Sequence, residues 1–330
     1  MNGMRRKFLA IATAVAAFRL DAPAQPGRNG RVVKIGYLTS VGVNPNHPNI
    51  LAFKDELRRL GWTEGRNFVF EQRRALGDRS KLDALARELA TFDPDLVVTP
   101  TQFEAVFAAR ALPNRPIVMC GGFDPVGAGL AQSLARPGGQ VTGFTYEQDV
   151  RMIQRYLQFA KDYVPELKRV GLLVEPLPGI DDAIEVHRLA ADKMGVAVSV
   201  QRVSRAEELE GAFAAFARDG VQVLGPFFTS LLITEAARVV ALTQRYGWPD
   251  IGSNVDEVEM GGFLAYAANR EDLFRRAARY ADRILKGEKP GDLPIQQPER
   301  YDLVINLKTA KALGRPVPQS LLIQATRLIE

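Results

Sequence analysis

The chain has 330 residues, 46% of them hydrophobic and 25% charged, so it can bury the core of one large domain or two ordinary ones. Its formal net charge of +5 falls to +2 without the first 24 residues, because these hold four basic residues and one acidic residue and leave 39 basic against 37 acidic residues. A nearly balanced chain without a charged run argues against nucleic acid as a partner, and a single cysteine, Cys120, excludes an internal disulfide.

Residues 1–24 are typical of an export signal peptide. Basic residues at positions 5–7 precede an apolar core over residues 8–18, and Ala22-Pro23-Ala24 offers a cleavage site before Gln25. The core is too short to span a bilayer as a mature helix, and the basic start also resembles a twin-arginine signal. No cysteine follows the cleavage site, so we expect no lipid anchor. We predict a periplasmic protein that is cleaved near Ala24; the alternative is an amphipathic N-terminal helix.

Strand and helix patterns alternate along the first half of the remaining chain. Apolar runs that stop at hydroxyl residues or glycine predict buried strands, and apolar residues three or four positions apart predict helices. The expected strands cover residues 32–38, 68–70, 96–98 and 117–120. The expected helices cover residues 50–60, 78–89 and 102–111.

The fourth of these strands leads into an unusual segment. It stops at Gly121-Gly122 and a Phe123-Asp124-Pro125 turn, and we expect a short glycine-containing helix next, followed by a second turn over residues 136–139. A buried strand therefore delivers a polar loop at its C-terminal end, which is where open α/β sheets bind ligands.

The same alternation repeats in the second half. The expected strands cover residues 170–174, 196–203, 221–224, 249–253 and 262–267. The expected helices cover residues 181–193, 205–217 and 231–246, with a short helix over 255–260. A helix over 271–287 and a strand over 300–306 complete the chain. Strands that alternate with helices of this length imply parallel sheets. The sequence therefore predicts an α/β protein with two doubly wound parallel-sheet lobes and a cleft between them.

Motifs for nucleotide-dependent or hydrolytic chemistry do not occur. The chain has no G-x-x-x-x-G-K-[ST] loop, no G-x-G-x-x-G loop and no G-x-S-x-G elbow. Its two histidines, His47 and His187, lack metal-ligand spacing. We therefore expect no catalytic residues, no metal and no cofactor. Catalysis by carboxylates alone stays open, although nothing points to it.

Polar residues follow the first-half strands. Thr39 and Ser40 come after the first strand, and Thr101 and Gln102 stand where the third strand meets a helix N-terminus. Backbone N–H groups at such an N-terminus attract anions such as an amino-acid carboxylate. Each of these four side chains either contacts a ligand or serves as a helix cap.

Two further loops contribute candidates. Phe123 and Asp124 follow the fourth strand, where Asp124 either accepts a ligand ammonium group or only stabilises the turn. Phe227 and Phe228 follow the strand expected at 221–224. Aromatic rings there suggest an apolar or stacking wall of a pocket, and we expect at least one of them to face the cleft.

The last candidates lie at the ends of the final strands. Asn254 can donate and accept hydrogen bonds at once, and Asp256 either pairs with an amine or caps the short helix. Tyr266 closes the strand before the helix at 271–287, where it either contacts a ligand or packs locally.

Two motifs carry a family resemblance. The first is DPVGAGL over residues 124–130, continued by SLARPGGQVTG over residues 133–143. The second is LKGEKPGDLP over residues 285–294, continued by YDLVINLKTAKALG over residues 301–314. With their order and spacing, these segments resemble the family of ABC transporter substrate-binding proteins that includes periplasmic tryptophan- and tyrosine-binding proteins.

The resemblance implies a type I periplasmic binding protein-like fold in which a three-crossing hinge joins the lobes. By analogy, the crossings fall near residues 144–148, 267–270 and 297–301. Lobe 1 would then comprise residues 30–146 plus 268–299. Lobe 2 would comprise residues 147–267 plus 300–330.

The resemblance also implies a function. It predicts a solute-binding protein of an ABC importer that holds a small organic molecule, either amino acid-like or an aromatic or apolar carboxylate, between its lobes. Its partners would be a membrane permease and an ATPase, and we expect a monomer. The alternative is a soluble ligand-sensing protein of the same fold that feeds a receptor. A transcription regulator would need a DNA-binding helix-turn-helix where the signal peptide lies.

Overall fold

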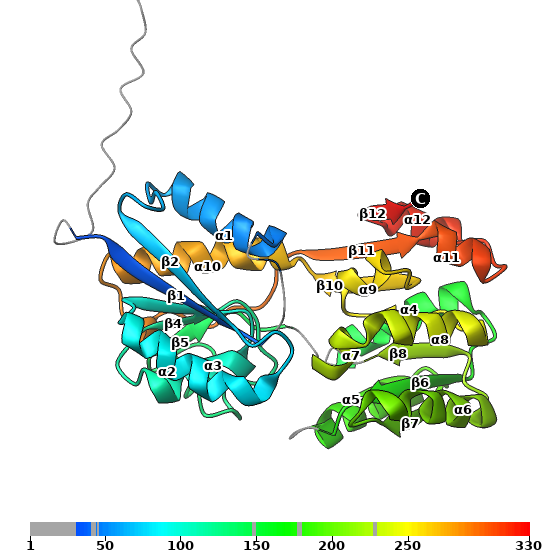
Figure 1. The fold of residues 1–330 in the computed structure, drawn as a ribbon. Coiled ribbons are helices and arrows are strands. Elements are labelled where there is room, and N and C mark those ends of the chain that lie inside the picture. The colour runs from blue at the N-terminus through cyan, green and yellow to red at the C-terminus, as the bar shows by residue number, and fades with distance from the viewer. Residues whose placement is uncertain (1–30, 41–43, 45, 147–149, 177–179, 227–229) are drawn as a thin grey trace, which may run out of the picture.

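Figure 1 shows a computed structural model of the chain, which describes residues 31–40, 44, 46–146, 150–176, 180–226 and 230–330. The predicted signal peptide and the predicted site residues Phe227 and Phe228 lie outside the described residues. The helices and strands form two α/β groups side by side (Figure 1). We call the group around β1 to β5 lobe 1 and the group around β6 to β12 lobe 2.

Lobe 1 contains a parallel sheet with the strand order β2-β1-β3-β4-β5. Alternation along β1 sends successive side chains to opposite faces, and Tyr37 lies opposite Gln72 of β2 and Val98 of β3. The strands are β1 (Val33–Thr39), β2 (Phe68–Arg74), β3 (Leu96–Thr99), β4 (Ile117–Met119) and β5 (Val141–Gly143).

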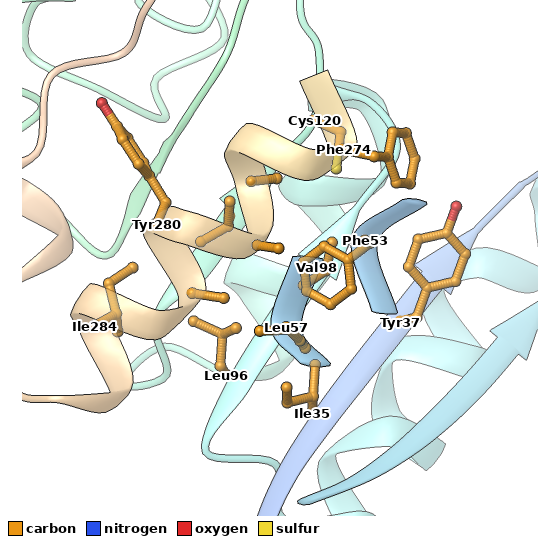
Figure 2. Packing of buried hydrophobic residues seen from close by; sticks show 14 of the residues in the cluster. Ile35, Tyr37, Phe53, Leu57, Leu96, Val98, Cys120, Phe274, Tyr280 and Ile284 are labelled. Atoms are coloured by element: carbon orange, nitrogen blue, oxygen red, sulfur yellow. The ribbon is translucent and has the colours of Figure 1, made fainter. Parts of the chain in front are cut away.

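Helices cover both faces of this sheet. In the close view of Figure 2, Phe53 and Leu57 of α1 meet Phe274 and Ile284 of α10 over the strands. Cys120 belongs to the same core, where burial raises the pKa of its thiol. The helices are α1 (Pro48–Arg59) and α10 (Arg270–Leu285) on this face, and α2 (Leu82–Phe92) and α3 (Gln102–Ala111) in the core on the other.

The sheet of lobe 2 is mixed rather than wholly parallel. A bridge between Leu224 and Asp250 joins the order β7-β6-β8 to β9-β10-β11-β12. β11 runs antiparallel to β10 because the chain returns from lobe 1 to start it, instead of from a crossover helix within lobe 2. The strands are β6 (Arg169–Val174), β7 (Ala197–Arg202), β8 (Val223–Pro226), β9 (Ile251–Gly252), β10 (Leu264–Ala268), β11 (Tyr301–Asn306) and β12 (Arg327–Ile329).

Lobe 2 also has helices on both faces of its sheet. One core forms under α4 (Val150–Tyr163), α5 (Ile180–Asp192), α11 (Leu307–Ala312) and α12 (Gln319–Gln324). Other cores form under α6 (Leu209–Asp219), α7 (Ser230–Thr234) and α8 (Ala236–Tyr246), and under α9 (Val255–Glu259). Short 3-10 helices are η1 (Arg79–Lys81), η2 (Ala206–Glu208) and η3 (Pro290–Asp292).

The chain passes between the two lobes after β5, between β10 and α10, and before β11 (Figure 1). Backbone bonds tie these passages together, because Thr145 N donates to Gln296 O at 2.9 Å and Asn269 N donates to Arg300 O at 2.9 Å. Arg276 of α10 adds a third tie, since its guanidinium donates to Gln296 Oε1 at 2.6 Å and lies over the Phe144 ring. Three adjacent strand-like connections of this kind form one narrow bridge.

Several local expectations were wrong. The segment after Pro125 forms consecutive turns over residues 125–129 instead of a short helix. The helix expected over 231–246 is interrupted at Glu235, which separates α7 from α8. Five elements of the structure were not predicted from the sequence: β5, α4, α11, α12 and β12.

Candidate ligand-binding site

A cavity of about 30 Å³ lies between the two lobes. Lobe 1 supplies its walls from the end of β1, the start of α1, the loop after β3 and the first turns of α10, and lobe 2 supplies them from α7 and α9. The lining residues are Tyr37, Thr39, His47, Asn49, Ile50, Pro100, Ile233, Asp256, Arg270 and Phe274. Because both lobes contribute, the shape of this cavity depends on how the lobes are arranged.

Arg270 supplies the positive charge of the cavity. It is the first residue of α10, held there because Asn269 caps the helix by accepting a hydrogen bond from Asp272 N at 2.8 Å. Its Nη1 lies 3.9 Å from Asp256 Oδ2 on α9 of the other lobe, and its guanidinium also contacts the Tyr146 hydroxyl. The cavity therefore has a cation and an anion on facing walls.

Aromatic and histidine side chains surround this charged pair. Burial raises the pKa values of the Tyr37 and Tyr146 phenols, so both stay neutral hydrogen-bonding groups. His47 caps α1, and its Nδ1 accepts a hydrogen bond from Asn49 N at 3.3 Å. Burial and the nearby Arg270 charge lower the pKa of His47, which favours neutral imidazole.

Next to the cavity, Glu104 binds two predicted site residues. This side chain is 1% exposed, and its Oε1 accepts from the backbone N–H of Ser40 at 2.9 Å and from the Ser40 hydroxyl. Its Oε2 accepts from the Thr101 hydroxyl, which in turn accepts from Phe103 N at 3.1 Å to cap α3. Glu104 thus joins the loop after β1 to the loop after β3.

Gln102 fixes the loop after β4. Its Oε1 accepts hydrogen bonds from Phe123 N and Asp124 N, each at 2.8 Å. The Asp124 carboxylate faces its own turn, where Oδ1 accepts from Gly127 N at 2.8 Å. The Phe123 ring is 44% exposed and lies 5.3 Å from the Tyr146 ring. Phe123 and Tyr146 therefore form an aromatic pair at the border of lobe 1.

In lobe 2, Asn254 begins α9. Its Oδ1 accepts from Asp256 N at 3.2 Å, which caps the helix. The side chain is 3% exposed, and its Nδ2 has no acceptor in the part of the chain that the structure describes. On α9 itself, burial raises the pKa of Glu257 to about 8, and burial raises the pKa of Asp250, just before β9, to about 6. The helix that carries Asp256 therefore also carries a buried carboxyl group, with a second one close to it.

Tyr266 lies on the opposite face of the lobe 2 sheet from α9. Its ring stacks on Tyr301 at 5.3 Å and meets Phe159 edge-on at 5.3 Å. It packs against the α4 core, whereas its neighbour Ala265 packs against α9. Tyr266 therefore belongs to an aromatic cluster near the passage into α10 and does not line the interlobe cavity.

A second cavity, of about 60 Å³, lies within lobe 2 between the sheet and α4 and α5. It is larger and mostly apolar, with Tyr156, His187 and Ser253 as its polar members. Only one lobe lines it, and no ion pair faces it among the described residues. We therefore take the interlobe cavity as the candidate ligand site.

The structure brings only some of the predicted residues together. Thr39 and Asp256 line the interlobe cavity. Ser40, Thr101 and Gln102 lie at the same edge of lobe 1, but each bonds within that lobe. The remaining described predictions are Phe123 and Asp124 in the neighbouring loop, Asn254 as the N-cap of α9, and Tyr266 on the other face of the lobe 2 sheet.

The sequence analysis missed several residues of this site. Arg270 stands at the end of a predicted crossing. A positive charge at the start of the following helix was the feature that could have identified it as a site residue. His47 precedes Pro48, a pattern typical of a helix N-terminus. Thr101 with Glu104 matches the T-x-x-E pattern of a capping box. Tyr37 and Tyr146 could not be found from the sequence, because only the fold brings Tyr37 to the cavity and Tyr146 to Arg270.

Within the described ranges, no group of three or more His, Cys, Asp or Glu side chains could hold a metal ion. No helix in those ranges combines the length and the apolar character that a membrane span requires.

Two α/β lobes, three connecting passages and a cavity lined from both lobes define a bilobal solute-binding protein. Comparison with known families agrees, since the family model described as "ABC transporter substrate binding protein" matches residues 46–329. The chain belongs to that family.

Individual relatives are more distant. The chain is 26% identical over 273 residues to a tyrosine-binding protein of Clostridioides difficile (strain R20291), a match that covers 81% of this chain and 78% of the relative. A solved ABC domain from Streptococcus pneumonia in complex with L-Trp is 26% identical, with a TM-score of 0.82 over 90% of this chain and 100% of that one. A ligand-free, open substrate binding protein with adhesive properties from Clostridium difficile is 23% identical, with a TM-score of 0.71 over 90% and 99%.

Proposed function

We propose that this protein binds an amino acid with an aromatic or apolar side chain in the interlobe cavity and delivers it to an ABC permease and its ATPase. One observation carries the choice of ligand class. Arg270 and Asp256 place opposite charges 3.9 Å apart on two walls that belong to different lobes. A zwitterion can bond to both charges at once, and charge-assisted hydrogen bonds are the strong ones.

In this proposal Arg270 binds the ligand carboxylate and Asp256 binds its ammonium group. A guanidinium presents donors in a geometry that matches a carboxylate. The sequence had suggested Thr101 and Gln102 for the carboxylate, and Asp124 or Asp256 for the ammonium group. Polar atoms of Thr101, Gln102 and Asp124 already bond within lobe 1, which favours Asp256 for the ammonium group and Arg270 for the carboxylate.

The aromatic preference rests on the lining and on the relatives. Tyr37, Ile50 and Phe274 offer apolar surface beside the charged pair. The relatives include a tyrosine-binding protein and an ABC domain in complex with L-Trp. Phe227 and Phe228 stay candidates for the lobe 2 wall by their place after β8.

The cavity has room for about two water molecules, since roughly 10–15 Å³ of such space holds one, and it is therefore too small for an amino acid. We therefore propose that the lobes separate to admit the ligand and close around it, with the passages near residues 144–148, 267–270 and 297–301 as the hinge. Closure is then driven by contacts that the ligand makes with both lobes. Domain boundaries at 30–146 plus 268–299 and 147–267 plus 300–330 follow from this proposal.

Export and the absence of catalysis complete the proposal. We infer cleavage near Ala24 and a monomeric periplasmic protein that binds its ligand without turnover. Mass spectrometry under native conditions tests this on protein purified from the periplasm. The expected result is a monomer that begins at or near Gln25 and carries an unmodified amino acid. A protein that retains Met1, or a ligand that is chemically converted on incubation, would contradict it.

A further inference from the structure

A second ion pair joins the two lobes, on the side away from the hinge. Arg79 Nη1 of lobe 1 donates to Glu175 Oε1 of lobe 2 at 3.4 Å. Arg79 follows β2, the edge strand of lobe 1 farthest from β5, and Glu175 follows β6, which β8 and β9 separate from β10. Rotation about a hinge beside β5 and β10 separates these positions, because they lie away from those strands, so opening breaks this contact.

Each partner is held in place by its own lobe. The Arg79 guanidinium lies 4.6 Å from the centre of the Phe103 ring, at the first turn of α3. Glu175 uses its second oxygen, Oε2, to accept a hydrogen bond from Leu231 N at 3.3 Å. The pair therefore connects the start of α3 in lobe 1 to the start of α7 in lobe 2.

The α7 helix links this contact to the candidate site. Ile233 of α7 lines the interlobe cavity. Its neighbour Thr234 approaches lobe 1 closely, since a Cβ atom on Gly77 would lie 3.6 Å from Thr234 Oγ1. Glu175 thus positions the helix that carries the lobe 2 wall, and Arg79 fixes Glu175 against lobe 1.

We propose that the Arg79–Glu175 pair is a latch that holds the lobes closed and prolongs retention of the ligand. The inference rests on the proposed function for its ligand, although the latch itself is a property of the two lobes. Arg79 and Glu175 are positioning residues, because neither lines the cavity. With side chains 24% and 17% exposed, the pair is shielded more than an ordinary surface pair and is still accessible to salt.

The latch predicts an effect mainly on dissociation. Ligand enters the open form, and the latch also holds part of the ligand-free protein closed, so losing the latch should raise the association rate by less than it raises the dissociation rate. Ligand leaves only after opening, so the dissociation rate should rise about two- to fivefold, the range expected for one partly exposed ion pair. The affinity should fall by a smaller factor, because the latch stabilises the closed form of the ligand-free protein as well.

A double-mutant cycle tests the latch. Arg79→Met removes the charge and keeps the stem over Phe103, and Glu175→Gln keeps an acceptor for Leu231 N. The control is Arg58→Met, which removes a charge from an exposed pair with Asp55 within α1. Stopped-flow binding of L-tryptophan and L-tyrosine should show faster dissociation for each single variant and no further change for the double variant. Equal rates in parent and variants, or effects that multiply in the double variant, would overturn the proposal.

A second readout needs no ligand. Small-angle scattering of the ligand-free protein at about 0.05 M salt should give a larger radius of gyration for Arg79→Met than for the parent, and about 0.5 M salt should reduce the difference. If neither amino acid binds the parent, the ligand class proposed above is wrong, and scattering alone decides on the latch. In that case an equal radius for the parent and Arg79→Met would overturn the latch.

Discussion

Arg270 and Asp256 face each other across the boundary between the lobes, with Nη1 3.9 Å from Oδ2. Arg270 starts α10 at the passage out of β10, whereas Asp256 lies in the first turn of α9. The two charges are too far apart for a strong hydrogen bond, yet close enough to hold one another in the absence of ligand. A ligand that inserts between them exchanges one long ion pair for two short charge-assisted bonds.

The close packing of Gly121 against Tyr146 predicts that a larger residue at position 121 disturbs the site. A Cβ atom at position 121 would lie 2.2 Å from Tyr146 Cζ, so Gly121→Ala must displace the ring that contacts Arg270. We expect ligand affinity to fall by about tenfold and stability by about 1–3 kcal/mol, the usual cost of overpacking. Calorimetry and urea unfolding measure the two effects. Gly211→Ala is the control, because nothing lies within 4 Å of its added Cβ on α6. Normal affinity in Gly121→Ala would show that Tyr146 does not organise the site.

Glu104 predicts a loss of stability. Glu104→Ala leaves the Ser40 N–H, the Ser40 hydroxyl and the Thr101 hydroxyl without their acceptor inside lobe 1. The free energy of unfolding should fall by roughly 3 kcal/mol or more, since each buried unsatisfied group costs about 1–3 kcal/mol. Glu104→Gln, which keeps one acceptor oxygen, should lose less. Urea unfolding of the three proteins measures the order, and equal stability of Ala and Gln variants would contradict it.

Two variants of Asp124 distinguish a turn-stabilising role from a role in binding the ligand ammonium group. Its Oδ1 accepts from Gly127 N at 2.8 Å, so a turn-stabilising role needs only an acceptor. We expect Asp124→Asn to bind ligand like the parent, and Asp124→Ala to lose about 1 kcal/mol of stability. Titration calorimetry with thermal unfolding makes the comparison. If Asp124→Asn binds as weakly as Asp124→Ala, the carboxylate charge contacts the ligand after all.

Glu257 predicts how stability depends on pH. Burial raises its pKa from 4.5 to about 8, so the folded protein keeps a proton that the unfolded chain releases. This contribution to stability is fully present below about pH 4.5 and is lost as the pH rises to about 8. Asp250, with a pKa near 6, adds the same trend at lower pH. Glu257→Gln should therefore flatten the stability curve and exceed the parent above about pH 8, which urea unfolding across pH measures. A parent curve that rises from pH 5 to 8 would exclude a neutral Glu257.

The local sequence pattern was sufficient to predict most of the fold and part of the candidate site. The strands that end at Thr39 and Thr99 could be predicted, because apolar runs bounded by hydroxyl residues report burial directly. Helix α4 could also have been predicted, since Met152, Ile153 and Leu157 are buried at helical spacing. The three residues of β5 are too few to produce a pattern. The antiparallel β11 follows from the return across the hinge, which no local signal encodes.

The site was harder to predict for a physical reason. A polar residue at a strand end can either contact a ligand or form hydrogen bonds within its own lobe, and the sequence does not say which of the two occurs. Ser40 and Thr101 bond to Glu104, whereas Thr39 lines the cavity. The Arg270–Asp256 pair depends on how the two lobes meet, so the sequence offered Asp256 as a candidate for an amine but did not point to Arg270 beside it.

The most direct test of the account is titration calorimetry with L-tryptophan and two analogues, tryptamine, which lacks the carboxylate, and indole-3-propionate, which lacks the ammonium group. The parent should bind L-tryptophan at least about tenfold more tightly than either analogue, because each lost charge-assisted bond is worth about 1.5–3 kcal/mol. Arg270→Met should bind L-tryptophan and tryptamine equally weakly, and Asp256→Asn should lose its preference for L-tryptophan over indole-3-propionate. Arg275→Met, one helix turn away and paired with Glu271, should behave like the parent. If Arg270→Met still prefers L-tryptophan over tryptamine by the parent's factor, the ligand carboxylate does not bind at Arg270 and the proposed site is wrong.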